Sequence, residues 1–215
     1  YMAIPSESSH NNWRSGLYVK ASGVEFKMIP VAGYSGGFFL MAETETTEAL
    51  YKSVKGTAST SQLPIDNISY SEITSFIEKL NSETKLNFSL PSVEQWLYAA
   101  EGGDKTQDYI FAGSDTPDDV AWYSANCSSK QAVKTKAPNE LGIYDMSGNV
   151  GEFVSNSKSS YSERDICGGG YCSSISYIKK DSYVTTNYTT SKAGYGVILG
   201  YNDGSHNRSR GVGFR

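Results

Sequence analysis

The sequence is poor in cysteine, histidine and long apolar runs, and each shortage narrows what the chain can be. Three cysteines among 215 residues are too few for a disulfide framework. No stretch approaches the roughly 18 apolar residues that a membrane helix needs. The net charge is −4, whereas binding to nucleic-acid phosphates favours a basic surface. The sequence therefore predicts no membrane span and no nucleic-acid partner.

Two features bear on the redox state and the location of the chain. Cys167 and Cys172 are close enough in sequence to pair across the four residues between them, which would leave Cys127 alone. Three unpaired cysteines acting as small apolar side chains fit the sequence equally well. The sequence begins with Tyr1 rather than Met, which indicates a removed leader and predicts a secreted or cell-surface protein.

What the chain does have is tyrosine and glycine, with 16 of the first and 21 of the second. Tyrosine gives a large contact area at low entropic cost, and Ser, Asn and Gly supply adaptable hydrogen bonds. This composition is typical of a binding surface, and it is equally typical of an extracellular protein with many loops.

Hydrophobic patterning predicts strands first and helices next. Val24–Ile29 begins with alternating apolar and polar residues and turns at Pro30, while Phe38–Met41 forms a second strand after a Gly-rich turn, which gives a hairpin. Two helices follow, each preceded by a capping box, Ser69 with Glu72 and Ser92 with Gln95. Their apolar stripes predict core faces, and the residues are Ile73, Phe76, Ile77 and Leu80 in the first helix and Val93, Trp96, Leu97 and Ala100 in the second.

After Gly103 the helical periodicity ends, and Gly, Asn, Ser and Tyr interrupt short apolar runs. Such a sequence favours short strands and ordered loops that pack on the helical half. We therefore expect a single α+β domain over residues 23–215. Residues 1–22 are polar and are expected to form a lead-in or tail.

The run Leu141–Phe153 is the strongest candidate for a metal site. Two carboxylates, Asp145 and Glu152, lie on either side of a Ser-Gly-Asn turn. A tight turn aims main-chain carbonyls such as those of Gly148 and Val150 inward, and hard cations take carboxylate and carbonyl oxygens as ligands.

The same run resembles the G-L-Y-D-M-x-G-N-V-W-E-W segment of the formylglycine-generating (sulfatase-modifying factor) family. Five further blocks follow the pattern of that family in order, and they are Glu45–Tyr51, Leu63–Tyr70, Leu90–Ala100, Gly168–Tyr171 and Gly213–Arg215, with Ala137–Glu140 leading into the run. The resemblance implies a variant of the C-type lectin fold, with two helices, short antiparallel strands and long ordered loops.

The resemblance also implies a structural calcium ion. It further shows which residues a catalytic centre of the family's type would need. In relatives, the positions of Asp145, Gly148, Val150 and Glu152 bind calcium, although Gly151 stands here in place of the family's Trp. The family's oxidases bind copper through two cysteines about five residues apart, since thiolates suit Cu(I).

Cys172 lies near the first of these cysteine positions, but the residue five further on is Tyr177. A three-histidine iron site, used by another branch of the superfamily, is also excluded because only His10 and His206 exist. We therefore expect no catalytic residues. A copper-dependent formylglycine-generating oxidase that acts on a Cys or Ser of a sulfatase-like substrate, through Cys172, is the alternative.

Without catalysis, the scaffold is expected to bind a protein or glycan ligand through loops of its second half. The expected binding residues are Tyr183, Tyr188, Tyr195, Tyr201, Asn202, Asp203, His206 and Asn207. One group of proteins with this core carries a C-terminal region diversified by retroelements, and residues 171–210 are similar to that region in position and composition. A structural or adhesion module at the cell surface is a further alternative.

Overall fold

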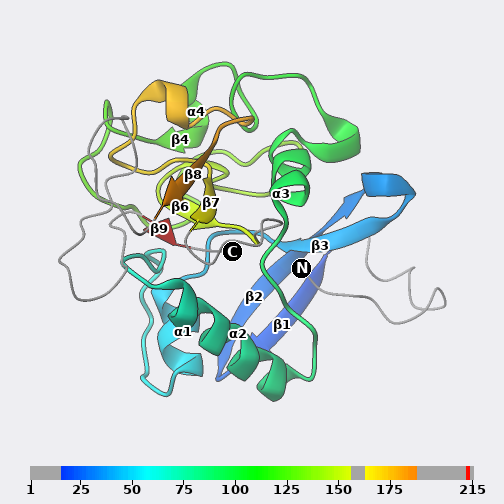
Figure 1. Ribbon diagram of the computed structural model, residues 1–215, viewed down its shortest axis with the longest axis vertical. Coiled ribbons are helices and arrows are strands. Elements are labelled where there is room, and N and C mark those ends of the chain that lie inside the picture. Colours follow the sequence, from blue (N-terminus) through cyan, green and yellow to red (C-terminus); the bar gives the residue numbers. More distant parts are fainter. Residues whose placement is uncertain (1–15, 156–162, 188–211, 214–215) are drawn as a thin grey trace.

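The computed structural model describes residues 16–155, 163–187 and 212–213 (Figure 1). Short helices and three small sheets alternate with long loops. In chain order the elements are β1 (Leu17–Ala21), β2 (Val24–Ala32), η2 (Tyr34–Gly36), β3 (Phe38–Ala42), α1 (Glu48–Val54), α2 (Tyr70–Thr84), α3 (Val93–Ala100), η3 (Gly103–Lys105), α4 (Pro117–Val120), β4 (Ala121–Trp122), β5 (Ser147–Gly148), β6 (Gly151–Phe153), β7 (Glu163–Cys167), η4 (Ile175–Tyr177), β8 (Tyr183–Asn187) and β9 (Val212–Gly213).

The first sheet is an antiparallel meander in the order β1-β2-β3. The predicted hairpin is confirmed, but β2 continues through Pro30, which pairs with Leu40. Proline is tolerated there because β1 begins with Leu17, which pairs with Met28, so among the described residues β2 has no partner on that side beyond Met28. Strand β1 lies within the stretch expected as a lead-in, and its pairing with β2 makes residues 17–21 part of the sheet.

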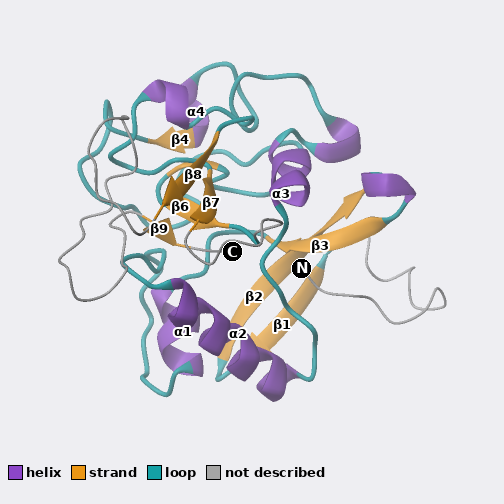
Figure 2. Ribbon diagram, in the orientation of Figure 1, coloured by secondary structure: helices purple, strands orange, loops and turns teal. Residues whose placement is uncertain are grey.

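Helices α1 and α2 cover one end of this sheet (Figure 2). The capping box of Ser69 and Glu72 is present at the start of α2, and Ile73, Phe76 and Leu80 are buried as predicted. They pack with apolar residues of β1–β3 and α1 into one core. Helix α1 was not expected from the sequence; it begins after Thr47, whose side chain accepts a hydrogen bond from the Leu50 N–H.

Helix α3 packs against the opposite side of the first sheet and forms a second core. Its capping box of Ser92 and Gln95 is also present. Trp96 is fully buried and packs with Val31 of β2, Met146 and Cys167 of β7. The helix therefore joins the first half of the chain to the second.

The second half consists mainly of loops around two small sheets. Strands β4 and β5 form a parallel pair, and a four-stranded sheet has the order β8-β7-β6-β9, in which β6 and β9 are parallel and the other pairs antiparallel. The four α-helices and the short sheets of the described residues confirm the predicted α+β class. In the described part of the chain, no helix has the length and apolar character required to cross a bilayer.

Candidate functional site

The run Leu141–Phe153 is buried between the two halves of the fold, and its first acid is held by a loop. Asp145 is buried in a left-handed backbone conformation at φ +56°. Its Oδ2 accepts a hydrogen bond of 2.9 Å from the backbone N–H of Lys134. The carboxylate therefore has a fixed orientation within the turn.

Gly148 is required by the local backbone. Its φ is +81°, and a Cβ at this position would lie 2.3 Å from the carbonyl oxygen of Trp122. The close approach arises because Gly148 pairs with Trp122 in the parallel β4–β5 bridge, while its N–H donates to the carbonyl of Gly168 at 2.8 Å. This glycine thus allows three chain segments to meet.

The second acid, Glu152, is anchored by α3. The indole Nε1–H of Trp96 donates to Glu152 Oε2 at 2.6 Å, and both residues are buried. Glu152 lies in β6, opposite Cys167 of β7. The family's Trp is replaced by Gly151, yet another tryptophan holds the carboxylate in place.

A further buried acid, Glu45, binds the same turn, although the sequence did not indicate it as a site residue. Its Oε1 accepts from the Val150 N–H at 2.9 Å, and its Oε2 accepts from Asn149 Nδ2 at 2.7 Å. Asn149 also accepts a hydrogen bond from the Gln131 N–H. Glu45 opens the first of the family-like blocks, which is the one signal in the sequence that could have identified it.

Asp145, Gly148, Val150 and Glu152 are all buried in the structure. Among the described residues there is no group of three or more His, Cys, Asp or Glu side chains arranged to hold a metal ion. The predicted calcium ligands include only two carboxylate side chains, because the other two ligands are backbone carbonyls, so this absence does not bear on them. The calcium ion stays a prediction.

All three cysteines are free thiols. Cys167 is fully buried in the second core, and burial, with the nearby Glu152 and Asp165 carboxylates, raises the pKa of its thiol well above the usual value. Cys172 and Cys127 are partly exposed, and Cys127 lies beside the segment that carries Cys172. The pairing of Cys167 with Cys172 considered from the sequence is therefore absent.

Of the expected binding residues, only Tyr183 lies within the described part of the chain. Tyr183 is 51% exposed and begins β8, an outer strand of the four-stranded sheet. Ile110 and Ile175 are also about half exposed, at 49% and 48%. The others lie outside the described residues, and they are Tyr188, Tyr195, Tyr201, Asn202, Asp203, His206 and Asn207.

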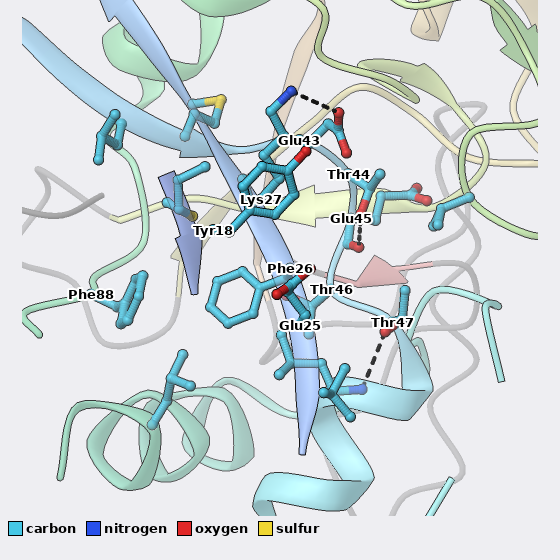
Figure 3. Close-up of a pocket in the computed structure, with 18 of the residues that line it drawn as sticks. Tyr18, Glu25, Phe26, Lys27, Glu43, Thr44, Glu45, Thr46, Thr47 and Phe88 are labelled. Carbon is cyan, nitrogen blue, oxygen red and sulfur yellow. Dashed lines mark hydrogen bonds and ion pairs between the residues drawn. The ribbon is translucent and has the colours of Figure 1, made fainter. Parts of the chain in front are cut away.

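A cavity of about 270 Å³ opens in the first half, beside β2 (Figure 3). Apolar side chains such as Phe26 and Phe88 line its inner part. At its rim, Glu43 forms ion pairs with Lys27 at 3.7 Å and with Lys134 at 2.8 Å. Among the described residues that line it are neither the four expected calcium ligands nor Tyr183, and nothing in the sequence predicted the cavity.

A known protein family matches most of this chain. The model of the Sulfatase-modifying factor enzyme 1-like domain matches residues 14–199. The Chaperone protein LppX of Paenibacillus barcinonensis is 40% identical over 84 residues, which cover 31% of this chain and 30% of that protein. The match thus spans less than a third of that relative.

Solved structures with the same fold cover most of the chain. Treponema denticola variable protein 1 has a TM-score of 0.71 and 21% identity, over 93% of this chain and 97% of that chain. CarF has a TM-score of 0.65 and 18% identity, over 88% and 97%. PvdO from Pseudomonas aeruginosa has a TM-score of 0.57 and 16% identity, over 73% and 62%. These likenesses confirm the predicted fold.

Proposed function

Because the chain belongs to the Sulfatase-modifying factor enzyme 1-like family, we propose that it uses the family's scaffold to bind a protein or glycan ligand and does not oxidise a substrate cysteine. The observation that carries this proposal is that three exposed side chains of the second half, Ile110, Ile175 and Tyr183, lie on neighbouring chain segments. We call the exposed face of these segments the 110–175–183 surface.

Hydrogen bonds join the three segments that form this surface. The N–H of Lys180 donates to the carbonyl of Ile110 at 3.3 Å, and the Ser182 hydroxyl donates to the carbonyl of Ser176 at 3.0 Å. The residues next to Ser182 and Ser176 are Tyr183 and Ile175. Large apolar side chains exposed on neighbouring segments favour a binding role, and tyrosine is among the residue types most enriched at binding sites.

The positions of the cysteines support the non-catalytic part of the proposal. A copper centre of the family's type needs two thiolates about five residues apart, and Tyr177 of η4 lies five positions after Cys172. Cys167, the other nearby cysteine, is enclosed in the second core with a raised pKa. A buried thiol of this kind is inert rather than reactive.

We also propose that the segment from Asp145 to Glu152 holds a structural calcium ion. Its two buried carboxylates and the backbone carbonyls of Gly148 and Val150 are oxygen ligands of the kind that calcium takes. Hydrogen bonds from Trp96 and the Lys134 N–H orient the two acids, as surrounding residues commonly do for metal ligands. Such an ion would stabilise the turn and would take no part in chemistry.

Diversification of residues 171–210 is part of the same proposal. The fold is shared with a Treponema denticola protein named as a variable protein, and the stretch begins at the 110–175–183 surface. The gene supplies the test: a nearby template repeat that matches this stretch, together with a reverse transcriptase gene, would support diversification, and their absence would count against it.

The binding proposal is tested with two exposed tyrosines. The purified protein is assayed on arrays of glycans and of displayed peptides, and each ligand found is measured in solution by calorimetry. Tyr183→Ala is expected to weaken binding by about tenfold or more. Tyr18→Ala, at a position 62% exposed on the first sheet, is the control and should bind as the native chain does. Equal affinity of both variants would reject the assigned surface.

The oxidase alternative has its own assay. The copper-loaded protein is incubated with a cysteine-containing peptide of the sulfatase type, and oxygen consumption is recorded. We expect no consumption above that of copper with peptide alone. Consumption that disappears in Cys172→Ser would overturn the non-catalytic reading.

A further inference from the structure

Cys127 ends a tight turn that follows β4. The N–H of Cys127 donates to the carbonyl of Tyr123 at 3.0 Å, and the N–H of Tyr123 donates to Asn126 Oδ1 at 2.9 Å. The Asn126 side chain also donates to the carbonyl of Ala121 at 3.0 Å. These bonds fix the direction in which the Cys127 side chain leaves the turn.

The segment 171–173, which contains Cys172, lies directly against this turn. The thiol of Cys127 is 3.9 Å from the carbonyl oxygen of Tyr171. A few residues away, the N–H of Ser124 donates to the carbonyl of Ser173 at 3.1 Å. The two contacts on either side of Cys172 show that both segments run side by side at this point.

The contact between Cys127 and Tyr171 limits how far apart the two cysteines can lie. A carbonyl oxygen lies about 2.8 Å from the Cα of the next residue in a trans peptide, so Cys127 Sγ lies within about 7 Å of the Cys172 Cα. Rotation about the Cα–Cβ bond of Cys172 moves its sulfur within that space. The Cys127 Cα lies about 2.8 Å from its own sulfur, so the two Cα atoms lie at most about 10 Å apart. A disulfide spans about 4.4 to 6.8 Å between Cα atoms, a range that lies inside this limit.

We propose that Cys127 and Cys172 are a redox-sensitive pair that closes into a disulfide and ties the turn after β4 to the segment leading into η4 and β8. The pair differs from the Cys167–Cys172 pair that sequence proximity suggests. Cys167 is enclosed among Trp96 and its neighbours in the second core, whereas both members of the proposed pair are partly exposed.

The closing reaction is a thiol–disulfide exchange with a small-molecule disulfide such as oxidised glutathione. One protein thiolate attacks that disulfide, forms a mixed disulfide and releases one glutathione thiolate. The second protein thiolate then attacks the protein-bound sulfur and releases the other. Two protein thiols are oxidised to one disulfide, and one oxidised glutathione is reduced to two thiols, so electrons and protons balance.

The surroundings of Cys127 favour a pair that is stable as thiols until an oxidant is present. Burial raises the pKa of the Cys127 thiol, and the neighbouring Cys172 adds to the rise, although the Ser129 N–H and Lys136 act in the opposite direction. A thiol with a raised pKa is mostly protonated near neutral pH and reacts slowly.

Peptide mapping tests the proposal without any variant. Trypsin cleavage after Lys and Arg leaves Cys127 in the peptide 106–130, and Cys167 with Cys172 in the peptide 165–179. After treatment with oxidised glutathione, alkylation and digestion without reductant, we expect the two peptides to be covalently joined. Fragmentation of the joined peptides should place the bond at Cys172. The buried Cys167 should react with the alkylating reagent only after the protein is unfolded.

Two variants and a melting curve complete the test. Cys172→Ser should abolish the joined species, and so should Cys127→Ser, with circular dichroism as the check of folding. Because the bond closes a loop of about 45 residues, oxidation should raise Tm by roughly 5 to 10 °C in the native chain and in neither variant. A bond confined to peptide 165–179, or glutathione adducts with no joined peptides, would overturn the proposal.

Discussion

The indole of Trp96 donates a 2.6 Å hydrogen bond to the carboxylate of Glu152, two residues that are 56 positions apart in the chain. The bond links α3, which belongs to the helical half, to β6 in the loop-rich half. It also satisfies one oxygen of a carboxylate that has no access to solvent. A buried carboxylate without such a donor is costly, so the bond is central to how the two halves stay together.

Replacement of Trp96 by phenylalanine should therefore destabilise the protein mainly through the lost donor. We expect Trp96→Phe to lower the free energy of unfolding by about 2 kcal/mol or more, measured by urea denaturation. Trp122→Phe is the matched control, because the Trp122 indole donates to Thr135 Oγ1 at 2.8 Å in a solvent-exposed position. Its cost should stay below about 1 kcal/mol, and an equal loss in both variants would contradict the special role of the Glu152 contact.

The backbone at Gly148 should tolerate no side chain. Gly148→Ala would place a methyl group against the Trp122 carbonyl in a left-handed conformation, and we expect a loss of more than about 3 kcal/mol or failure to fold. Gly142→Ala separates strain from collision, because Gly142 has φ +86° and open space at the Cβ position. That variant should lose only about 1 to 2 kcal/mol. If the two variants have the same melting temperature, the collision with the Trp122 carbonyl contributes nothing to the loss of stability.

The ion-pair network of α1 predicts an acid-dependent loss of stability. Burial acts to raise the pKa of Glu48, but hydrogen bonds from Lys130 and Lys52 outweigh it and lower the pKa to about 2 from 4.5. The carboxylate of Glu48 therefore binds a proton more tightly in the unfolded chain than in the folded one. The stability that its ion pairs contribute is complete above about pH 4.5 and is lost as the pH falls towards 2.

The native chain should accordingly lose more stability between pH 5 and pH 3 than Glu48→Gln, as measured by urea midpoints. Parallel curves for the two proteins would show that Glu48 makes no contribution. Lys52→Met, which removes the more exposed of the two lysines, should leave most of the pH dependence in place because the Lys130 contact remains.

Calcium removal should lower Tm if the turn from Asp145 to Glu152 holds the ion. A protein that binds calcium only in its folded state gains stability with calcium concentration, so chelation should reduce Tm by several degrees. Glu152→Ala and Asp145→Asn should abolish the response to chelator. Glu43→Gln, which changes an acid at the rim of the cavity, should retain it. If Tm of the native chain is the same with and without chelator, the turn holds no such ion.

The sequence predicted the elements that local chemistry determines. The two capping boxes marked the starts of α2 and α3 because a helix N-terminus has to satisfy its N–H groups locally. Helix α1 was missed because it has only seven residues, too short for a clear apolar stripe. Strand β1 was missed although Leu17, Val19 and Ala21 alternate with exposed residues, because the strand is only five residues long and follows a polar stretch. Its pairing with β2 decides its structure.

The candidate site was also predicted only in part from the sequence. The order of the family-like blocks identified the buried turn and its acids Asp145 and Glu152. The contacts of Glu45 with Val150, and of Cys127 with the segment next to Cys172, join positions far apart in the chain. Such contacts depend on how loops pack on each other, for which a single sequence carries no periodic signal.

The order of the four-stranded sheet has a consequence for how the chain can change. Strand β8 ends at Asn187 and β9 begins at Val212, and both belong to that sheet. The two ends of the stretch 188–211 are therefore secured by backbone hydrogen bonds that do not depend on which side chains lie between them. The entropic cost of closing a chain segment rises by only about 0.6 kcal/mol when its length doubles. A change in the number of residues between Asn187 and Val212 would therefore add little to the closure entropy that forming this sheet costs.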